Sequence, residues 1–205
     1  VLDMKEITAA LTGTTQVTAA VYSVGPNVDE GTVTHTLAGP PDTVQKIHFT
    51  GLEPVVDLVA GPLTVNATNG NNAINVGRTG GGNGLVSVDG FEAIEFAGKT
   101  SLTVNALGGS DTISVNNPAG LSGNITVYGG DPTGSDRLIV NGTSGQDLAI
   151  FRPTGVDDGS VSVPGLPTVN FDTVESVTYD GQGGDDQLIV ETPGYTDIIT
   201  LTPGS

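Results

Sequence analysis

Leu102-Thr-Val-Asn-Ala-Leu-Gly-Gly-Ser-Asp-Thr-Ile-Ser-Val115 is the stretch of sequence that decides the fold, because variants of it recur at residues 63–76, 125–140 and 177–190. Each copy reads as a strand, a Gly-rich turn and a second strand. The first copy has Asn72 just before its second strand, and the other three carry an acidic residue there, namely Asp111, Asp136 and Asp186. A supersecondary unit that recurs along a chain usually stacks on its neighbours, so the pattern predicts a repeat architecture.

A longer repeat encloses the short one. Residues 71–115 match residues 146–190 at an offset of 75, which divides into three steps of 25. Glycine stands at every step, at Gly84, Gly109, Gly134, Gly159 and Gly184. Four positions after each glycine comes an apolar residue, in turn Val88, Ile113, Leu138, Val163 and Leu188.

This register predicts an all-β parallel β-helix, or solenoid, with coils of about 25 residues, because three short strands and three turns fit into that length. The glycines would turn the chain at positive φ, and the apolar residues would stack inside. An antiparallel β-sandwich is the alternative fold, since each short motif also fits a local hairpin.

Strand and turn signals alternate along most of the chain. Aromatic residues are few, five Phe and four Tyr without Trp, so we expect a core of small branched residues. A helix is conceivable only at residues 1–11, where Thr and Val disfavour it. We expect strands at residues 17–23, 32–37, 44–50, 63–66, 85–88, 93–96, 102–105, 125–128, 138–141, 148–151, 174–179, 188–190 and 198–201.

Three parts are expected along the 205 residues. Residues 1–43 lack the corner glycine and form an N-terminal β cap or packed β element, because a solenoid needs its open end covered. Residues 44–191 form the repeat region. Residues 192–205 form a C-terminal strand and a linker that ends in Thr-Pro-Gly-Ser.

The charge balance excludes some partners. With 23 acidic and six basic residues the net charge is −17, which repels nucleic acids and anionic membranes. The sequence contains no apolar run long enough for a transmembrane helix, so we expect no membrane insertion. Cysteine is absent, so any cross-link by a metal would use oxygen ligands and a hard ion such as calcium.

The Gly-rich acidic turns Gly108-Gly-Ser-Asp111, Gly129-Gly-Asp-Pro-Thr-Gly-Ser-Asp136 and Gly183-Gly-Asp-Asp186 resemble the nonapeptides of the RTX (hemolysin-type) calcium-binding family. They are still more similar to the degenerate Gly-Asp-Asp-x-Leu-x-Val units of large bacterial surface proteins of the planctomycete type. The resemblance covers about residues 44–190. It implies calcium as a cofactor, held by Asp111, Asp131, Asp136, Asp185 and Asp186.

The turns depart from the RTX pattern in their spacing, since they stand 25 and 50 residues apart instead of following every nine residues. In a 25-residue coil Asp111 and Asp136 would lie one above the other, about 4.8 Å apart. They would then either share a cation or repel each other. The alternative interpretation is that these aspartates only form turns, by accepting backbone hydrogen bonds.

Catalysis finds little support in the sequence. His35 and His48 occupy alternating positions in expected strands, where exposure is the expected state. Gly98-Lys99-Thr100 resembles the end of a phosphate loop, but no helix follows it, so we interpret it as a loop. The expected protein is therefore a non-enzymatic structural protein, secreted or on the cell surface, that self-associates end to end.

Two other functions stay open. One is an adhesin that binds surface glycans. The other is a polysaccharide-degrading β-helix enzyme, whose acids would come from Asp157-Asp158 and Asp185-Asp186. The scarcity of Arg, Lys and aromatic residues argues against the enzyme.

Overall fold

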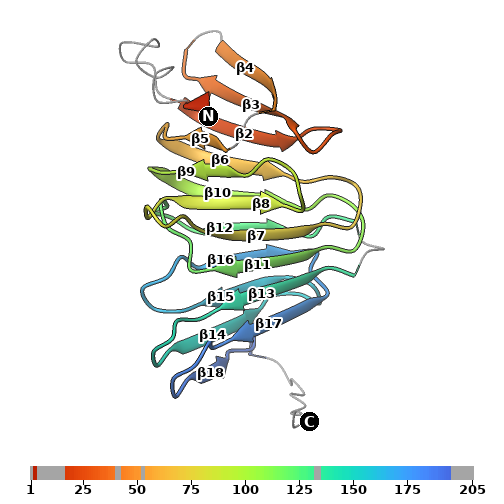
Figure 1. The fold of residues 1–205 in the computed structure, drawn as a ribbon. Helices are drawn as coiled ribbons and strands as arrows, with labels where there is room; N and C mark the ends of the chain where they lie inside the picture. The colour runs from red at the N-terminus through yellow and green to blue at the C-terminus, as the bar shows by residue number, and fades with distance from the viewer. Residues whose placement is uncertain (1, 4–16, 40–42, 52–53, 132–134, 195–205) are drawn as a thin grey trace.

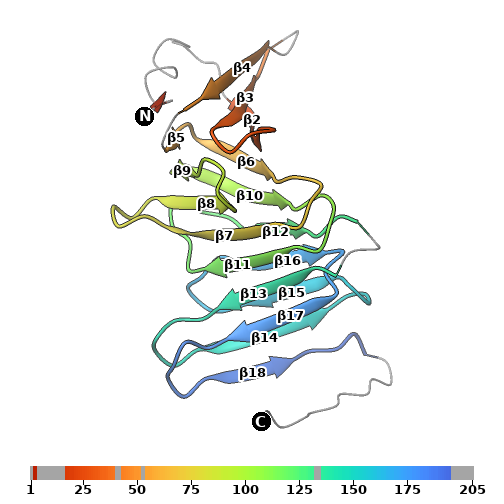
Figure 2. The same cartoon turned by 45° about the vertical axis from the view of Figure 1, so that its right-hand side comes forward.

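The structure is a computed structural model that describes residues 2–3, 17–39, 43–51, 54–131 and 135–194. Within these ranges the chain is all-β, as expected, and contains no helix. The strands form two mixed sheets and stack like rungs from the N-terminal hairpins down to β18 (Figure 1). Figure 2 shows the same ladder of strands from a second angle.

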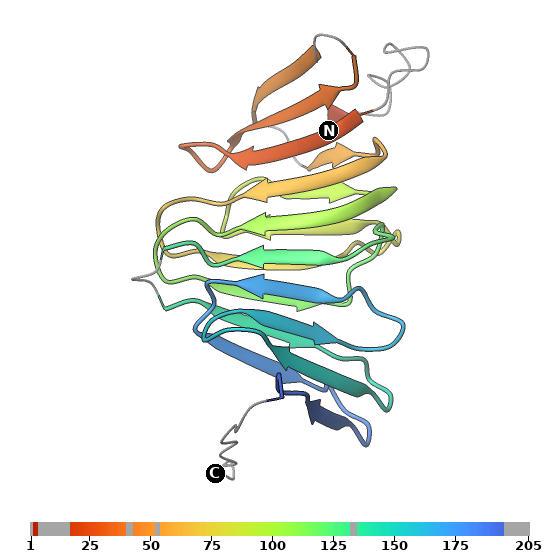
Figure 3. The ribbon, with the colours of Figure 1, turned by 180° about the vertical axis from the view of Figure 1, so that it is seen from behind.

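The two sheets contain eight and ten strands. Sheet A has the spatial order β1 (Leu2–Asp3), β5 (Val55–Asp57), β9 (Ile94–Phe96), β8 (Gly84–Val88), β7 (Ala73–Arg78), β11 (Thr112–Asn116), β13 (Arg137–Asn141) and β17 (Ser176–Asp180). Sheet B has the order β18 (Gln187–Val190), β14 (Leu148–Pro153), β15 (Gly159–Ser162), β16 (Val169–Asp172), β12 (Ile125–Tyr128), β10 (Lys99–Asn105), β6 (Gly61–Asn66), β2 (Val17–Val24), β3 (Glu30–Leu37) and β4 (Thr43–Thr50). The view from behind brings sheet B toward the reader (Figure 3).

The core consists of inward rows of branched side chains between the sheets. Side chains alternate between interior and solvent along each strand, and parallel neighbours stack like on like. One row in sheet B contains Leu63, Leu102, Ile125 and Val169. Its counterpart in sheet A contains Ile74, Ile113, Leu138 and Val177. The scarcity of aromatic residues is therefore matched by a core of stacked Val, Ile and Leu.

The Gly-rich acidic turns carry the chain from one sheet to the other. β6, β10 and β12 belong to sheet B, whereas the strands that follow their turns, β7, β11 and β13, belong to sheet A. The turn between β17 and β18 makes the reverse crossing. The two strands of each motif do not pair with each other, so each motif is an arch and not a hairpin.

The strand register differs from the expected 25-residue step. Ile113 lies opposite Leu138, which is a step of 25. The neighbouring steps are 39 residues, because Ile74 lies opposite Ile113 and Leu138 opposite Val177. A uniform step is wrong because extra antiparallel strands, β8–β9 and β15–β16, are inserted between the layers.

The expected apolar row breaks for the same reason. Val88 pairs antiparallel with Ile74 in sheet A, and Leu188 pairs with Ala149 in sheet B. Val163 is buried just after β15. Val88 therefore joins the row of Ile113 and Leu138 only through Ile74, whereas Val163 and Leu188 lie outside that row.

The five equally spaced glycines have two different roles. Gly109 and Gly184 turn the chain at φ of 107° and 92°, as expected. Gly84 and Gly159 lie inside strands instead, opposite Phe96 and Phe171, whose rings occupy the space that a Cβ would need. The corner role is therefore wrong for Gly84 and Gly159, and Gly134 lies outside the described residues.

The 75-residue repeat is present in the structure as two units. We call β5–β11 the first unit and β12–β18 the second unit. The antiparallel set β7–β8–β9 recurs as β14–β15–β16, and the 39-residue pair β7–β11 recurs as β14–β18. Corresponding strands lie in opposite sheets, because the first unit begins in sheet A with β5 and the second begins in sheet B with β12.

The N-terminal strands extend the stack beyond the first unit. β2 pairs in parallel with β6, and β3 and β4 continue sheet B antiparallel to one another. The expected strands do not include β5, β15 and β16. Of the expected helix at 1–11 the structure describes only Leu2–Asp3, which form β1, and the expected strand at 198–201 lies outside the described residues.

Candidate functional site

A ladder of side-chain oxygens runs along the arches that lead into sheet A. Asp111 Oδ1 accepts the backbone N–H of Asn72 at 2.7 Å, and Asp136 Oδ1 accepts that of Asp111 at 2.8 Å. Glu175 Oε2 continues the ladder by accepting the N–H of Asp136 at 2.6 Å. Each carboxylate thus binds the backbone one layer earlier, just before a strand begins, which stabilises the crossing.

Burial raises the pKa of two carboxyl groups in this ladder. Asp111 and Asp136 are 1% and 0% exposed, and the Oδ2 atom of each has no hydrogen-bond partner among the described residues. Burial, together with the charges of Asp136 and Asp89, raises the pKa of Asp111 to about 6 against the opposing hydrogen bond from Asn72. Burial also raises the pKa of Asp136, with contributions from Glu175 and Asp131.

The five predicted calcium ligands fall into two groups. Asp111, Asp136 and the half-buried Asp131 belong to arches that enter sheet A, and the charge of Asp131 acts on Asp136. Asp185 and Asp186 belong to the arch from β17 to β18, which enters sheet B. The two kinds of arch lie at opposite ends of the strands, so the five residues do not meet at one place.

The second group repeats the geometry of the first. Asp186 Oδ1 accepts the N–H of Asp147 at 2.8 Å, and Asp147 in turn accepts hydrogen bonds from Thr143. Asp185 is exposed to solvent. Backbone acceptance therefore accounts for Asp111, Asp136 and Asp186 without a cation.

Calcium needs six to eight oxygen ligands around one point. Among the described residues, no group of three or more His, Cys, Asp or Glu side chains converges to hold a metal. The arches thus fit the turn-forming interpretation better than an ion site, and calcium stays a prediction.

The two histidines differ in their surroundings. His48 is exposed on β4. His35 was expected to be exposed, but it is 1% exposed on β3 and bonded to Asp57. The expectation was wrong because His35 points inward from β3 toward Asp57 at the end of β5, a contact that the strand pattern alone does not show.

A buried charged cluster joins the N-terminal strands to the first unit. Asp57 Oδ2 lies 2.9 Å from Lys99 Nζ and 3.1 Å from His35 Nε2. Lys99, expected in a loop, is instead the first residue of β10 and is completely buried. The sequence carries only a weak signal that Lys99 is buried, since a single Lys in the Thr-rich segment 99–103 is also typical of an exposed strand.

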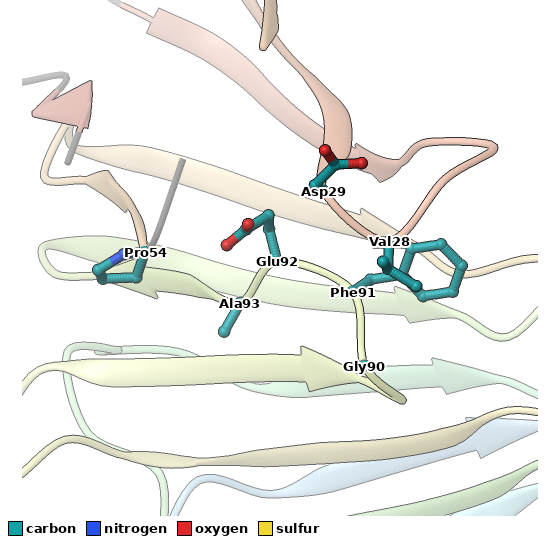
Figure 4. Close-up of a pocket in the computed structure, with 7 residues that line it drawn as sticks. All are labelled: Val28, Asp29, Pro54, Gly90, Phe91, Glu92 and Ala93. Carbon is teal, nitrogen blue, oxygen red and sulfur yellow. The ribbon is translucent and has the colours of Figure 1, made fainter. Parts of the chain in front are cut away.

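A surface pocket lies between the β2–β3 turn and the β8–β9 turn. It has a volume of about 380 Å³ and is lined by Val28, Asp29, Pro54, Gly90, Phe91, Glu92 and Ala93 (Figure 4). Val28 and Phe91 lie side by side at the right of the view and Pro54 lies at the left, with the carboxylates of Asp29 and Glu92 between them. Its described lining contains neither a His nor a hydroxyl side chain.

The C-terminal end of the stack exposes apolar side chains. Leu188 and Ile189 on β18 are 55% and 41% exposed within the described residues. Beside them a small apolar pocket of about 100 Å³ is lined by Phe151, Val161, Val177, Tyr179 and Leu188. β17 and β18 are the last strands of their sheets, so each leaves one edge unpaired by the described residues.

Comparison with known proteins gave no assignment. No protein-family model matches the sequence, and no curated protein or solved structure is significantly similar to it. The part of the chain that the structure describes contains no helix with the length and apolarity needed to cross a membrane. Function must therefore be argued from the geometry.

Proposed function

We propose that this chain is a structural module of a bacterial surface protein, built as a two-sheet β-solenoid that grows by stacking further units on its C-terminal end. The observation that carries the proposal is the internal repeat, since the end of the first unit is covered by the second unit in parallel strand register. The equivalent end of the second unit is open within the described residues.

Equivalent residues in the two units show how burial changes when the end of a unit is covered by the next unit. Ile113 of the first unit is 0% exposed under β13, whereas its counterpart Leu188 is 55% exposed. Val104 is fully buried under β12, whereas its counterpart Tyr179 is only partly buried. The exposed end therefore has the composition of an interior surface, and covering it removes apolar area from water.

The partner we propose for this end is a second copy of the chain. Edge strands with free N–H and C=O groups are templates for strand addition. In sheet B, β4 at the N-terminal edge runs in the same direction as β18, so a head-to-tail contact would continue the sheet with parallel strands. Such a heterologous contact produces filaments when it does not close into a ring.

A structural role also agrees with the state of the acidic and basic groups. The ladder carboxylates bind backbone N–H groups, and the Asp57 cluster is closed to solvent. Asp111, Asp136 and the Asp57 cluster are therefore not accessible to an external substrate. The location outside the cell rests on the resemblance of the acidic turns to RTX-type repeats.

Sedimentation velocity over a range of protein concentrations tests the proposal. We expect concentration-dependent association that increases with salt, because salt screens the repulsion between chains of net charge −17. Leu188→Lys should abolish association, because it places a charge on the apolar end. Val156→Lys is the matched control, since Val156 is fully exposed in the β14–β15 turn. A wild-type chain that stays monomeric at every concentration contradicts self-association.

Calcium is a separable part of the prediction. An ion that binds only the folded chain raises its melting temperature. Melting curves in EDTA and then in excess calcium decide the matter, and an identical midpoint in both removes calcium from the proposal.

A further inference from the structure

The buried cluster of Asp57, Lys99 and His35 has no role in the stacking proposed above. Asp57 ends β5 in sheet A, Lys99 begins β10 in sheet B, and His35 comes from β3. Their side chains are 0%, 0% and 1% exposed. The cluster therefore lies between the sheets, at the junction of the N-terminal strands and the first unit.

The contacts converge on one carboxyl group. Asp57 Oδ2 lies 2.9 Å from Lys99 Nζ and 3.1 Å from His35 Nε2, and Asp57 Oδ1 accepts the backbone N–H of Val59 at 3.0 Å. Lys99 Nζ also donates to the carbonyl oxygen of Val59 at 2.6 Å. An amine, a carboxyl group, a backbone N–H donor and an imidazole thus meet in one dry site.

Two protonation states of the pair are relevant. Burial raises the pKa of Asp57, but the hydrogen bonds and charges of His35 and Lys99 outweigh it and lower that pKa overall. Burial lowers the pKa of Lys99, and Asp57 only partly opposes this. The ion pair is the ground state, and one proton transfer from Nζ to Oδ2 gives a neutral amine beside a neutral acid. Burial disfavours the charged forms, so it brings this neutral state within reach.

We propose that Lys99 and Asp57 condense into an amide that cross-links the two sheets. The neutral Nζ attacks Asp57 Cγ, and a C–N bond forms. The negative charge that develops on Oδ1 is stabilised by the Val59 N–H, in the way that an oxyanion hole acts. His35 takes one proton from the nitrogen and delivers one to Oδ2, which leaves as water when the C–O bond breaks.

The site favours the product for two reasons. An amide is neutral, so it removes the cost of keeping an ammonium and a carboxylate in the interior. The absence of solvent access also protects the bond from hydrolysis. In a chain without cysteine, this bond would supply the covalent link between sheets that a disulfide supplies elsewhere.

Intact-mass spectrometry of the purified, folded wild-type chain tests the bond. We expect a mass lower than that of the sequence by one water molecule, and a branched peptide joining residues 57 and 99 after proteolysis. A mass equal to that of the unmodified sequence, in protein shown to be folded by circular dichroism, overturns the proposal. This measurement is independent of self-association, so the two proposals fail separately.

Variants of the cluster sharpen the test. Asp57→Asn should give the same amide by losing ammonia instead of water. Lys99→Arg keeps the positive charge without a condensing amine, so it should retain the full mass. His35→Gln should slow bond formation in freshly refolded protein by about 10²-fold, the usual contribution of a general acid or base. An unchanged rate in His35→Gln overturns the role given to His35.

Discussion

Replacing Gly109 by Ala tests the 39-residue register directly. Gly109 lies in the arch between β10 and β11 at φ of 107°, and a Cβ there would come within 2.7 Å of Gly70 C and 2.8 Å of Asn71 N. Both atoms belong to the backbone of the arch one layer earlier, which cannot move aside like a side chain. We expect about 1–2 kcal/mol from the positive φ and about 1–3 kcal/mol more from the overpacking.

Gly82→Ala is the matched control, because Gly82 also has a positive φ, 86°, but nothing lies within 4 Å of its Cβ position. It should cost only the conformational part, about 1–2 kcal/mol. A further 2 kcal/mol in Gly109→Ala corresponds to a melting temperature lower than that of Gly82→Ala by about 4–8 °C for a chain of this size. Differential scanning calorimetry measures both variants. Equal midpoints would show that the two arches are not in contact and would refute the 39-residue register.

Three further perturbations follow from the structure. The pKa of Asp111 is raised from 3.8 to about 6, so its contribution to the free energy of unfolding is complete below pH 4 and is lost as the pH rises through 6. Urea unfolding from pH 4 to 7 should show this decline in stability. The decline should be smaller in Asp111→Asn, which cannot titrate at this position. Lys99→Met removes the ion pair, or the amide proposed above, and leaves the buried Asp57 carboxyl with His35 alone, so it should lower the free energy of unfolding by about 3–5 kcal/mol in a guanidinium titration. A neutral result would mean that Asp57 reaches solvent. Gly84→Ala places a Cβ in the ring of Phe96 and should destabilise by about 1–3 kcal/mol, while Gly77→Ala, whose nearest neighbour is 3.7 Å away, should cost clearly less in the same titration.

The local elements were largely readable from the sequence. The alternation around Leu102 and Leu63, and the Gly-rich acidic turns after them, predict strands and turns at the positions where β10 and β6 end. These signals depend on residues only a few positions apart, so a single sequence contains them. The strands β5, β15 and β16 were missed because they contain only three or four residues each, too few for a clear alternating pattern.

The pairing of the strands could not be predicted from the sequence in the same way. An alternating strand keeps its inward face after any even shift, so a partner 39 residues away satisfies the pattern as well as one 25 away. The equal spacing of the glycines favoured a step of 25 residues between stacked strands and assigned the same role to Gly84 and Gly109. The structure separates them, because Gly84 accommodates the ring of Phe96 and Gly109 turns an arch.

Of the two candidate sites, one could be identified from the sequence and the other could not. Asp111 and Asp136 were singled out from the sequence, and the structure brings them together through one hydrogen bond. The cluster of His35, Asp57 and Lys99 was not identified from the sequence, because its members come from three strands that no local pattern connects.

The sequence by itself determined an all-β chain with a 75-residue repeat and acidic turns, since composition, alternation and turn chemistry act over short distances. Only the tertiary structure decided that the turns are arches, that half of the parallel strand pairs are offset by 39 residues, and that Lys99 is buried. Those features depend on which distant strands share hydrogen bonds, and strands with the same alternating pattern are interchangeable until the lengths of the intervening loops and the packing of side chains such as Phe96 select among them.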